Sequence, residues 1–117
     1  MAHHNNIGKQ GENLAHKWLI ENGYSVLHVN WRHKHLEVDF IVSKNNILYF
    51  FEIKTRTSKK FGNPEESVTA KKMNNLKLAA EEYLIQNPNW QWIQFNVLSI
   101  LIIESKIEYW LSEDVFF

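Results

Sequence analysis

Three carboxylates, and a lysine close to one of them in sequence, occur within residues 36–56, in a stretch that otherwise has the composition of a buried sheet. The stretch, LEVDFIVSKNNILYFFEIKTR, contains Glu37, Asp39, Glu52 and Lys54. Two β-rich runs, residues 37–43 and 47–53, flank a Lys-Asn-Asn sequence that is typical of a hairpin turn. We therefore expect these four residues on neighbouring strands, where their side chains can act together.

The hairpin predicts which side chains share a face. If Asn45 and Asn46 form the turn, Asp39 lies opposite Glu52 across the two strands. Opposed residues point to the same side of a sheet, and side chains repeat with period two, so Lys54 lies on that face as well. Opposed carboxylates repel unless a cation lies between them, and Mg²⁺ or Mn²⁺ is the usual cation for oxygen ligands. We expect such a site here, with Lys54 placed to orient a water or to stabilise a developing anion.

A solvated sheet face is the alternative interpretation of the same residues. Glu37 also falls on this face, across from Lys54, and the two would then form an ordinary cross-strand ion pair. Leu48 and Phe50 share the predicted face with Glu52, which argues against open solvent there. We therefore favour the metal site.

The composition predicts a single domain, residues 1–117, with 44% hydrophobic and 22% charged residues. No apolar run is long enough for a membrane span, and the N-terminal sequence MAHHNNIGKQ lacks the apolar region of a signal peptide. The chain has no cysteine, which excludes disulfides and thiolate zinc sites. We expect a cytoplasmic protein without a membrane partner.

Charge is distributed unevenly along the chain although the formal net charge is zero. Residues 1–80 contain 12 Lys and Arg against 7 Asp and Glu, whereas residues 81–117 contain one Lys against 6 acids. Such asymmetry suggests a polyanionic partner, although runs of charge are also common on solvated surfaces.

Basic residues surround the carboxylate stretch. Residues 31–35 form a basic and aromatic connection, residues 55–64 form a basic loop with Gly and Pro, and lysines continue on the next predicted helix. Cations that hold a backbone beside carboxylates that hold a metal suit a phosphodiester substrate. The candidate phosphate-binding residues are Arg32, Lys34, Arg56, Lys59, Lys60, Lys71 and Lys72. Trp90, Trp92 and Trp110 could stack on bases, although packing is the commoner role of tryptophan near strand ends.

Periodicity and turn residues predict the elements that position these side chains. They are a helix over 6–22, a strand over 24–30, the two strands above, a long helix over 65–87, and strands over 90–103 and 106–111. Glu12 lies at the edge of the apolar stripe of the first helix. Spacing alone favours a solvent-facing position for Glu12 over one that points towards the sheet.

The order of these motifs resembles the YraN-type endonuclease-like family, which is similar to archaeal Holliday-junction resolvases and the restriction-endonuclease fold. The matching motifs extend over nearly the whole chain and include Gly11-Glu12, Glu37-Val38-Asp39, Glu52-Ile53-Lys54, Phe61-Gly62 and Lys71. The resemblance implies an α/β fold with a mixed central sheet: one helix, three antiparallel strands, a long helix and further strands. It also implies a catalytic site of Glu12, Asp39, Glu52 and Lys54, in which the three carboxylates bind the metal.

The function that the resemblance implies is cleavage of DNA by a Mg²⁺- or Mn²⁺-dependent endonuclease. Two departures from the family pattern are Leu36, where glycine is usual, and Asn96, where aspartate is usual. There are two alternatives. One is a module that binds nucleic acid without cleaving it, and the other is a scaffold that binds protein through its acidic C-terminal part. Related nucleases often form homodimers, but nothing in this sequence identifies a self-complementary surface.

Overall fold

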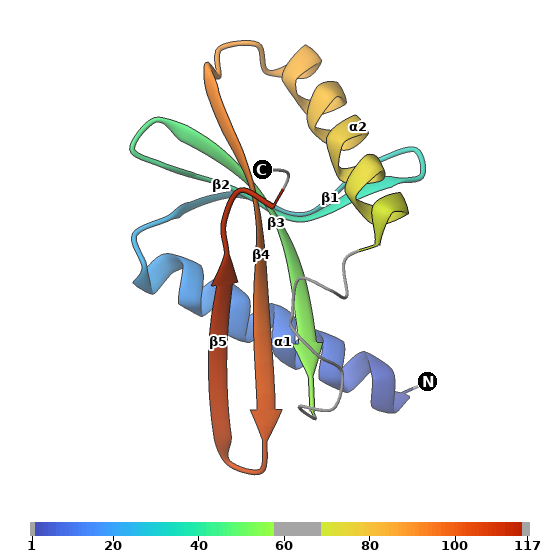
Figure 1. Ribbon diagram of the computed structural model, residues 1–117, viewed down its shortest axis with the longest axis vertical. Helices are drawn as coiled ribbons and strands as arrows, with labels where there is room; N and C mark the ends of the chain where they lie inside the picture. The colour runs from blue at the N-terminus through green and yellow to red at the C-terminus, as the bar shows by residue number, and fades with distance from the viewer. Residues whose placement is uncertain (1, 58–68, 116–117) are drawn as a thin grey trace.

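A five-stranded sheet forms the centre of the structure, a computed structural model that describes residues 2–57 and 69–115 (Figure 1). The elements are α1 (Ala2–Glu21), β1 (Ser25–His33), β2 (Leu36–Lys44), β3 (Ile47–Arg56), α2 (Ala70–Gln86), β4 (Trp92–Ile103) and β5 (Lys106–Ser112). The strands lie side by side in chain order, and β3 pairs with β4 in parallel while the other pairs are antiparallel. The predicted α/β fold with a mixed sheet is confirmed.

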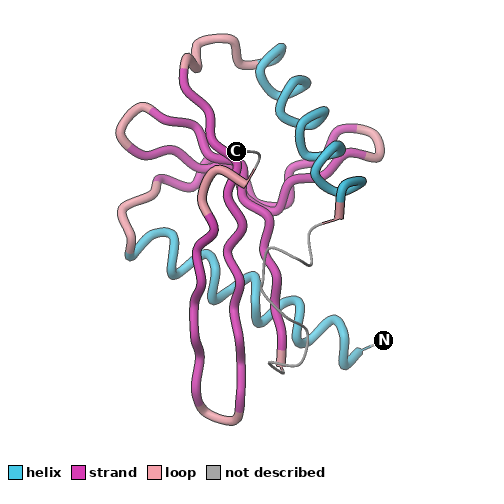
Figure 2. The backbone as a smooth tube through the Cα atoms, in the orientation of Figure 1, coloured by secondary structure: helices cyan, strands magenta, loops and turns pink. Residues whose placement is uncertain are grey.

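The two helices cover opposite faces of the sheet (Figure 2). Side chains of β3 alternate between them, so that Phe51 packs in the cluster under α1 and Phe50 packs in the cluster under α2. Both rings are fully buried, and each contributes roughly 1.5–3 kcal/mol by leaving water. Burial on both faces explains why β3 is apolar without interruption until Glu52. Within the described residues, neither helix is long and apolar enough to span a membrane.

A bend in the β1–β2 hairpin interrupts the alternation of β2. Val38 packs in the cluster under α2, yet Phe40, two residues later, packs in the cluster under α1. The change of face falls at Asp39. In β1 the residue opposite is Asn30, which lies between the paired positions 29 and 31 and has the left-handed φ of 53° that asparagine tolerates.

The bend separates β2 from β3. Their pairing runs from Lys44–Ile47 to Phe40–Phe51 and ends there, whereas β3 continues beside β4 as far as Arg56. Figure 1 shows β2 and β3 diverging from the centre of the sheet. The second half of β3, which contains Glu52 and Lys54, therefore pairs with β4 on one side and, among the strands of the described residues, with none on the other.

Several predicted boundaries shift. β1 continues to His33, through residues predicted as a connection, because Trp31, Arg32 and His33 pair with β2. α2 begins at Ala70 instead of residue 65, since Thr69 has extended backbone and its hydroxyl accepts a hydrogen bond from the Lys72 amide at 3.2 Å. Residues 65–68 lie outside the described part of the chain.

Asn96 anchors the C-terminal segment. Its side chain is fully buried in β4, and its Oδ1 accepts hydrogen bonds from Gln94 Nε2 at 3.1 Å and from the Asp114 amide at 3.2 Å. The amide of Val115 donates to the Phe95 carbonyl at 3.1 Å, which extends the same attachment. These contacts give Asn96 a structural role in holding residues 114 and 115 against β4.

Candidate functional site

A cleft of about 640 Å³ opens where β2 leaves β3. Its polar lining comes from both helices and three strands: Glu12, Asn30, Asp39, Lys54, Thr55 and Lys72. Three of the four residues predicted to form the catalytic site, Glu12, Asp39 and Lys54, thus line one cavity. The fourth, Glu52, lies beside Lys54.

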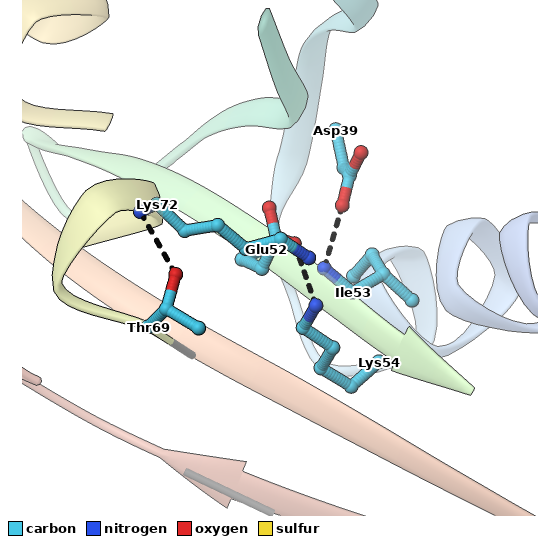
Figure 3. A network of polar contacts seen from close by, with 6 residues as sticks. All are labelled: Asp39, Glu52, Ile53, Lys54, Thr69 and Lys72. Carbon is cyan, nitrogen blue, oxygen red and sulfur yellow. Dashed lines mark hydrogen bonds and ion pairs between the residues drawn. The ribbon is translucent and has the colours of Figure 1, made fainter. Parts of the chain in front are cut away.

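Asp39 terminates the β2–β3 ladder with its side chain. Its Oδ2 accepts a hydrogen bond from the backbone amide of Ile53 at 2.7 Å (Figure 3). The prediction that Asp39 pairs directly with Glu52 in the ladder is wrong, because pairing ends one step earlier at Phe40–Phe51. The bend at Asp39 carries the backbone of β2 away, and the carboxylate takes the place of the next ladder acceptor.

Asp39 nevertheless lies near Glu52, because the amide that donates to Asp39 belongs to Ile53, the next residue after Glu52. Burial, followed by the negative charge of Glu52, raises the pKa of Asp39 from 3.8 to about 7, against the opposing effect of the hydrogen bond from Ile53. Glu37 adds to the rise, and Lys54 opposes it. The site therefore concentrates more negative charge around Asp39 than its nearest ammonium group offsets.

Two lysines meet at Glu52. Lys54 Nζ lies 3.4 Å from Glu52 Oε2, and Lys72 Nζ lies 3.7 Å from the same oxygen (Figure 3). The side chains of Glu52 and Lys54 are only 20% and 17% exposed, which strengthens their interaction. Burial and then the nearby Lys72 lower the pKa of Lys54. Lys72, predicted only as a phosphate contact, thus also belongs to the charge network of the site.

Glu12 is held by a residue that the sequence did not single out. Asn30 Nδ2 lies 3.2 Å from both carboxylate oxygens of Glu12 and donates to them across the cleft, from β1 to α1. Gly11 permits this position, since a Cβ there would overlap the side chain of Thr55 on β3. A glycine inside a helix, which costs roughly 1 kcal/mol relative to alanine, was the available signal of such a close approach.

The donor chemistry of Asp39 and Glu52 fits Mg²⁺ or Mn²⁺. Across residues 2–57 and 69–115, no three carboxylate or histidine groups lie close enough together to enclose a metal ion. Mg²⁺, however, is usually bound by one or two carboxylates together with water and substrate phosphates. The mutual repulsion of the two carboxylates is the feature that a divalent cation would relieve.

The other predicted residues are dispersed. Glu37 does not pair with Lys54 as the solvated-face interpretation required; its Oε2 lies 2.8 Å from Arg32 Nη2, because β1 is its neighbour beyond the bend. Lys34 is exposed at the turn of the same hairpin, and Lys71 is exposed in the first turn of α2. Arg56 is half-buried at the end of β3. Lys59 and Lys60 lie outside the described residues.

The raised pKa of Asp39 predicts how stability depends on pH. Between about pH 4 and pH 7 the folded state keeps a proton on Asp39 that the unfolded state has lost, so rising pH favours unfolding over this window. Above pH 7 the effect is constant. We expect Asp39→Asn, which cannot ionise, to flatten the dependence of the free energy of unfolding on pH, measured by urea unfolding from pH 4 to pH 8. Exposed Glu81→Gln on α2 is the control, and equal curves for wild type and Asp39→Asn would contradict the assignment.

Comparisons with known proteins place this sequence in a family. The model of the uncharacterised protein family UPF0102 matches residues 11–100. A UPF0102 protein of Flavobacterium psychrophilum is 40% identical over an alignment of 119 positions that covers 100% of this chain and 98% of the relative. A UPF0102 protein of Syntrophomonas wolfei is 42% identical over 101 residues, covering 86% of this chain and 88% of the relative. These names state a family and no activity.

Proposed function

This chain belongs to the UPF0102 family, the YraN-like family that its motifs resemble, and from that premise we propose that it is a nuclease dependent on Mg²⁺ or Mn²⁺. Its substrate would be the phosphodiester backbone of nucleic acid, with DNA as the first candidate. Its fold would be of the restriction-endonuclease-like type, to which archaeal Holliday-junction resolvases are related. A cytoplasmic homodimer would suit such a substrate, because cutting two strands needs two sites.

The crowding of Asp39 and Glu52 beside Lys54 is the observation that carries this proposal. Burial and then the negative charge of Glu52 raise the pKa of Asp39 to about 7, so that two carboxylates share a place where keeping both ionised costs free energy. These two residues would hold the cation, and Glu12 would contribute directly or through water. When bound, the cation supplies the Lewis acidity that polarises a phosphoryl oxygen and acidifies a water molecule.

The lysines supply the remaining electrostatics. Lys54, whose ammonium is fixed by Glu52 at 3.4 Å, would orient the attacking water and stabilise the charge that develops on the phosphoryl oxygens. Lys72, at the first turn of α2, would hold the phosphate as a compact point charge. The cleft that these side chains line is open to a phosphodiester on the side where β2 has left β3.

Binding of nucleic acid without cleavage is the second candidate function. The observation that favours it is the double ion pair of Glu52, because a carboxylate neutralised by Lys54 and Lys72 has less need of a metal ion. The basic residues would then hold the backbone, and affinity would fall steeply with salt.

Cleavage assays with a panel of substrates test the proposal. We expect the purified protein to nick branched, single-stranded or duplex DNA, or RNA, with Mg²⁺ or Mn²⁺ and not with EDTA. Asp39→Asn should lose both cleavage and the heat of Mn²⁺ binding in calorimetry, while the exposed control Glu81→Gln keeps both. Salt-sensitive retardation of DNA without cleavage would favour the second candidate, and absence of both cleavage and metal binding in the wild type would exclude the nuclease.

A further inference from the structure

An exposed tryptophan lies in the same cross-strand row as Lys54. In the sheet register Lys54 pairs with Ser99 of β4, and Ser99 pairs with Trp110 of β5. Paired residues point to the same side, so the three side chains form one row on the α2 side of the sheet. Trp110 is two strands from Lys54, or about 10 Å at the usual spacing of roughly 4.8 Å between strands.

The sheet extends beyond α2 (Figure 1). Figure 1 shows α2 beside the upper part of the sheet, while the lower parts of β4 and β5 lie away from it. Trp110 is 51% exposed, and within residues 2–57 and 69–115 its ring stacks on no other aromatic side chain. A half-exposed indole on a strand is a ready stacking surface for another planar ring.

Ser99, between the two, is a second unusual feature. It is only 5% exposed, and its hydroxyl has no hydrogen-bond partner within the described residues. An unpaired buried hydroxyl typically costs about 1–3 kcal/mol, so it is rare unless the position serves another purpose. A serine also leaves the shortest side chain at the centre of the row, between a lysine and a tryptophan.

The other tryptophans of the C-terminal part differ from Trp110. Trp90 is half-buried and packs against the cluster under α2. Trp92 is 65% exposed but stands at the start of β4, seven residues from Ser99, or about 23 Å at roughly 3.3 Å per residue. Trp110 thus combines exposure with a place next to the candidate site.

We propose that Trp110 stacks an unpaired base of the strand whose phosphodiester lies at Lys54 and Lys72. This inference rests on the proposed function and names its substrate class: a nucleic acid with unpaired nucleotides at the cleavage position. Two ammonium groups gathered around Glu52 attract the phosphate, and the row leads from them across Ser99 to the indole. In an intact duplex the bases are stacked on each other and withdrawn from such a surface, whereas an unpaired base offers its whole face.

Binding without metal tests this inference separately from cleavage. The probe is a short fluorescent oligothymidylate, titrated in EDTA at low salt and followed by anisotropy. We expect Trp110→Ala to weaken binding about tenfold, in line with typical stacking losses per base, and Trp110→Phe to retain most of the affinity. Trp92→Ala, an equally large truncation of a more exposed tryptophan, should leave affinity unchanged.

An abasic oligonucleotide of the same length provides the second arm, because it removes the bases and leaves the protein unchanged. Wild type should bind it more weakly than oligothymidylate, and Trp110→Ala should bind it no more weakly than wild type does, because the stacking partner is already missing. Equal effects of Trp110→Ala on both oligonucleotides, or no effect on either, would overturn the inference. A change in sedimentation of Trp110→Ala with unchanged binding would also overturn it and identify a second copy of the chain as the occupant.

The two proposals fail in different ways. If the wild type cleaves and Trp110→Ala binds and cleaves equally well, the stacking site is excluded and the proposed nuclease stands. If the wild type neither binds any oligonucleotide in EDTA nor cleaves any with Mn²⁺, both the stacking site and the nuclease are excluded.

Discussion

Lys54→Met is expected to lower the rate of phosphodiester cleavage by about 10²–10³-fold, the usual cost of removing one positioned electrostatic contact from a transition state. The methionine keeps much of the aliphatic length and loses the charge 3.4 Å from Glu52. Single-turnover cleavage with saturating protein measures this loss without a contribution from product release.

The matched control is Lys71→Met. Lys71 is exposed in the first turn of α2, next in sequence to Lys72, so that the same substitution removes the same charge outside the network around Glu52. We expect it to alter substrate affinity and its salt dependence and to leave the single-turnover rate within a few-fold of wild type. Equal losses in the two variants would mean that Lys54 contributes general charge and has no specific role.

Gly11→Ala is expected to destabilise the fold by about 1–3 kcal/mol, the usual cost of overpacking, and to reduce cleavage with it. A Cβ at this position overlaps the Thr55 side chain, and the nearest atoms belong to a strand in the middle of the sheet. α1 would have to move away from β3, and Glu12 would move with it. Urea unfolding measures the change in the free energy of unfolding. Comparing the cleavage rate of Gly11→Ala with that of Glu12→Gln shows how much of the lost activity comes from the displacement of Glu12.

Gly8→Ala is the control for the substitution itself. The same helix presents Gly8 to open space, where a methyl group would meet no other part of the described chain within 4 Å. Alanine there should stabilise the helix by up to about 1 kcal/mol. The double variant Gly11→Ala/Thr55→Gly removes the overlapping atoms, so its loss in free energy of unfolding should be smaller than the sum of the losses in the two single variants. Strict additivity would show that the close approach is not the cause.

The strands and their turn were predictable because they depend on local patterns. Alternation and the Asn45-Asn46 turn determine the pairing from Lys44–Ile47 to Phe40–Phe51, and the structure confirms it. The end of that pairing was not predictable. It depends on the bend opposite Asn30, where β2 passes from the cluster under α2 to the cluster under α1, and no local pattern of the sequence marks that change. For the same reason the partner of Glu37 is Arg32 on β1 and not Lys54 on β3.

The position of Glu12 illustrates the limit of periodicity. An amphipathic pattern identifies the buried side of α1 but not the distance at which the helix packs. That distance is set by Gly11 against Thr55, and the contact with Asn30 requires the bend in β1 as well. The place of Lys72 likewise depends on how the chain crosses from β3 to α2, a connection that no local pattern specifies.

The hydrogen bond between Ile53 and Asp39 gives one carboxylate two duties, as the last rung of a sheet and as a wall of the cleft. Because the Asp39 side chain accepts this backbone hydrogen bond, it is held in one rotamer, whereas an exposed surface carboxylate exchanges among several. The position of the Asp39 oxygen is therefore fixed by the backbone of β3, and a substitution that moves this carboxylate would also change where β2 and β3 separate.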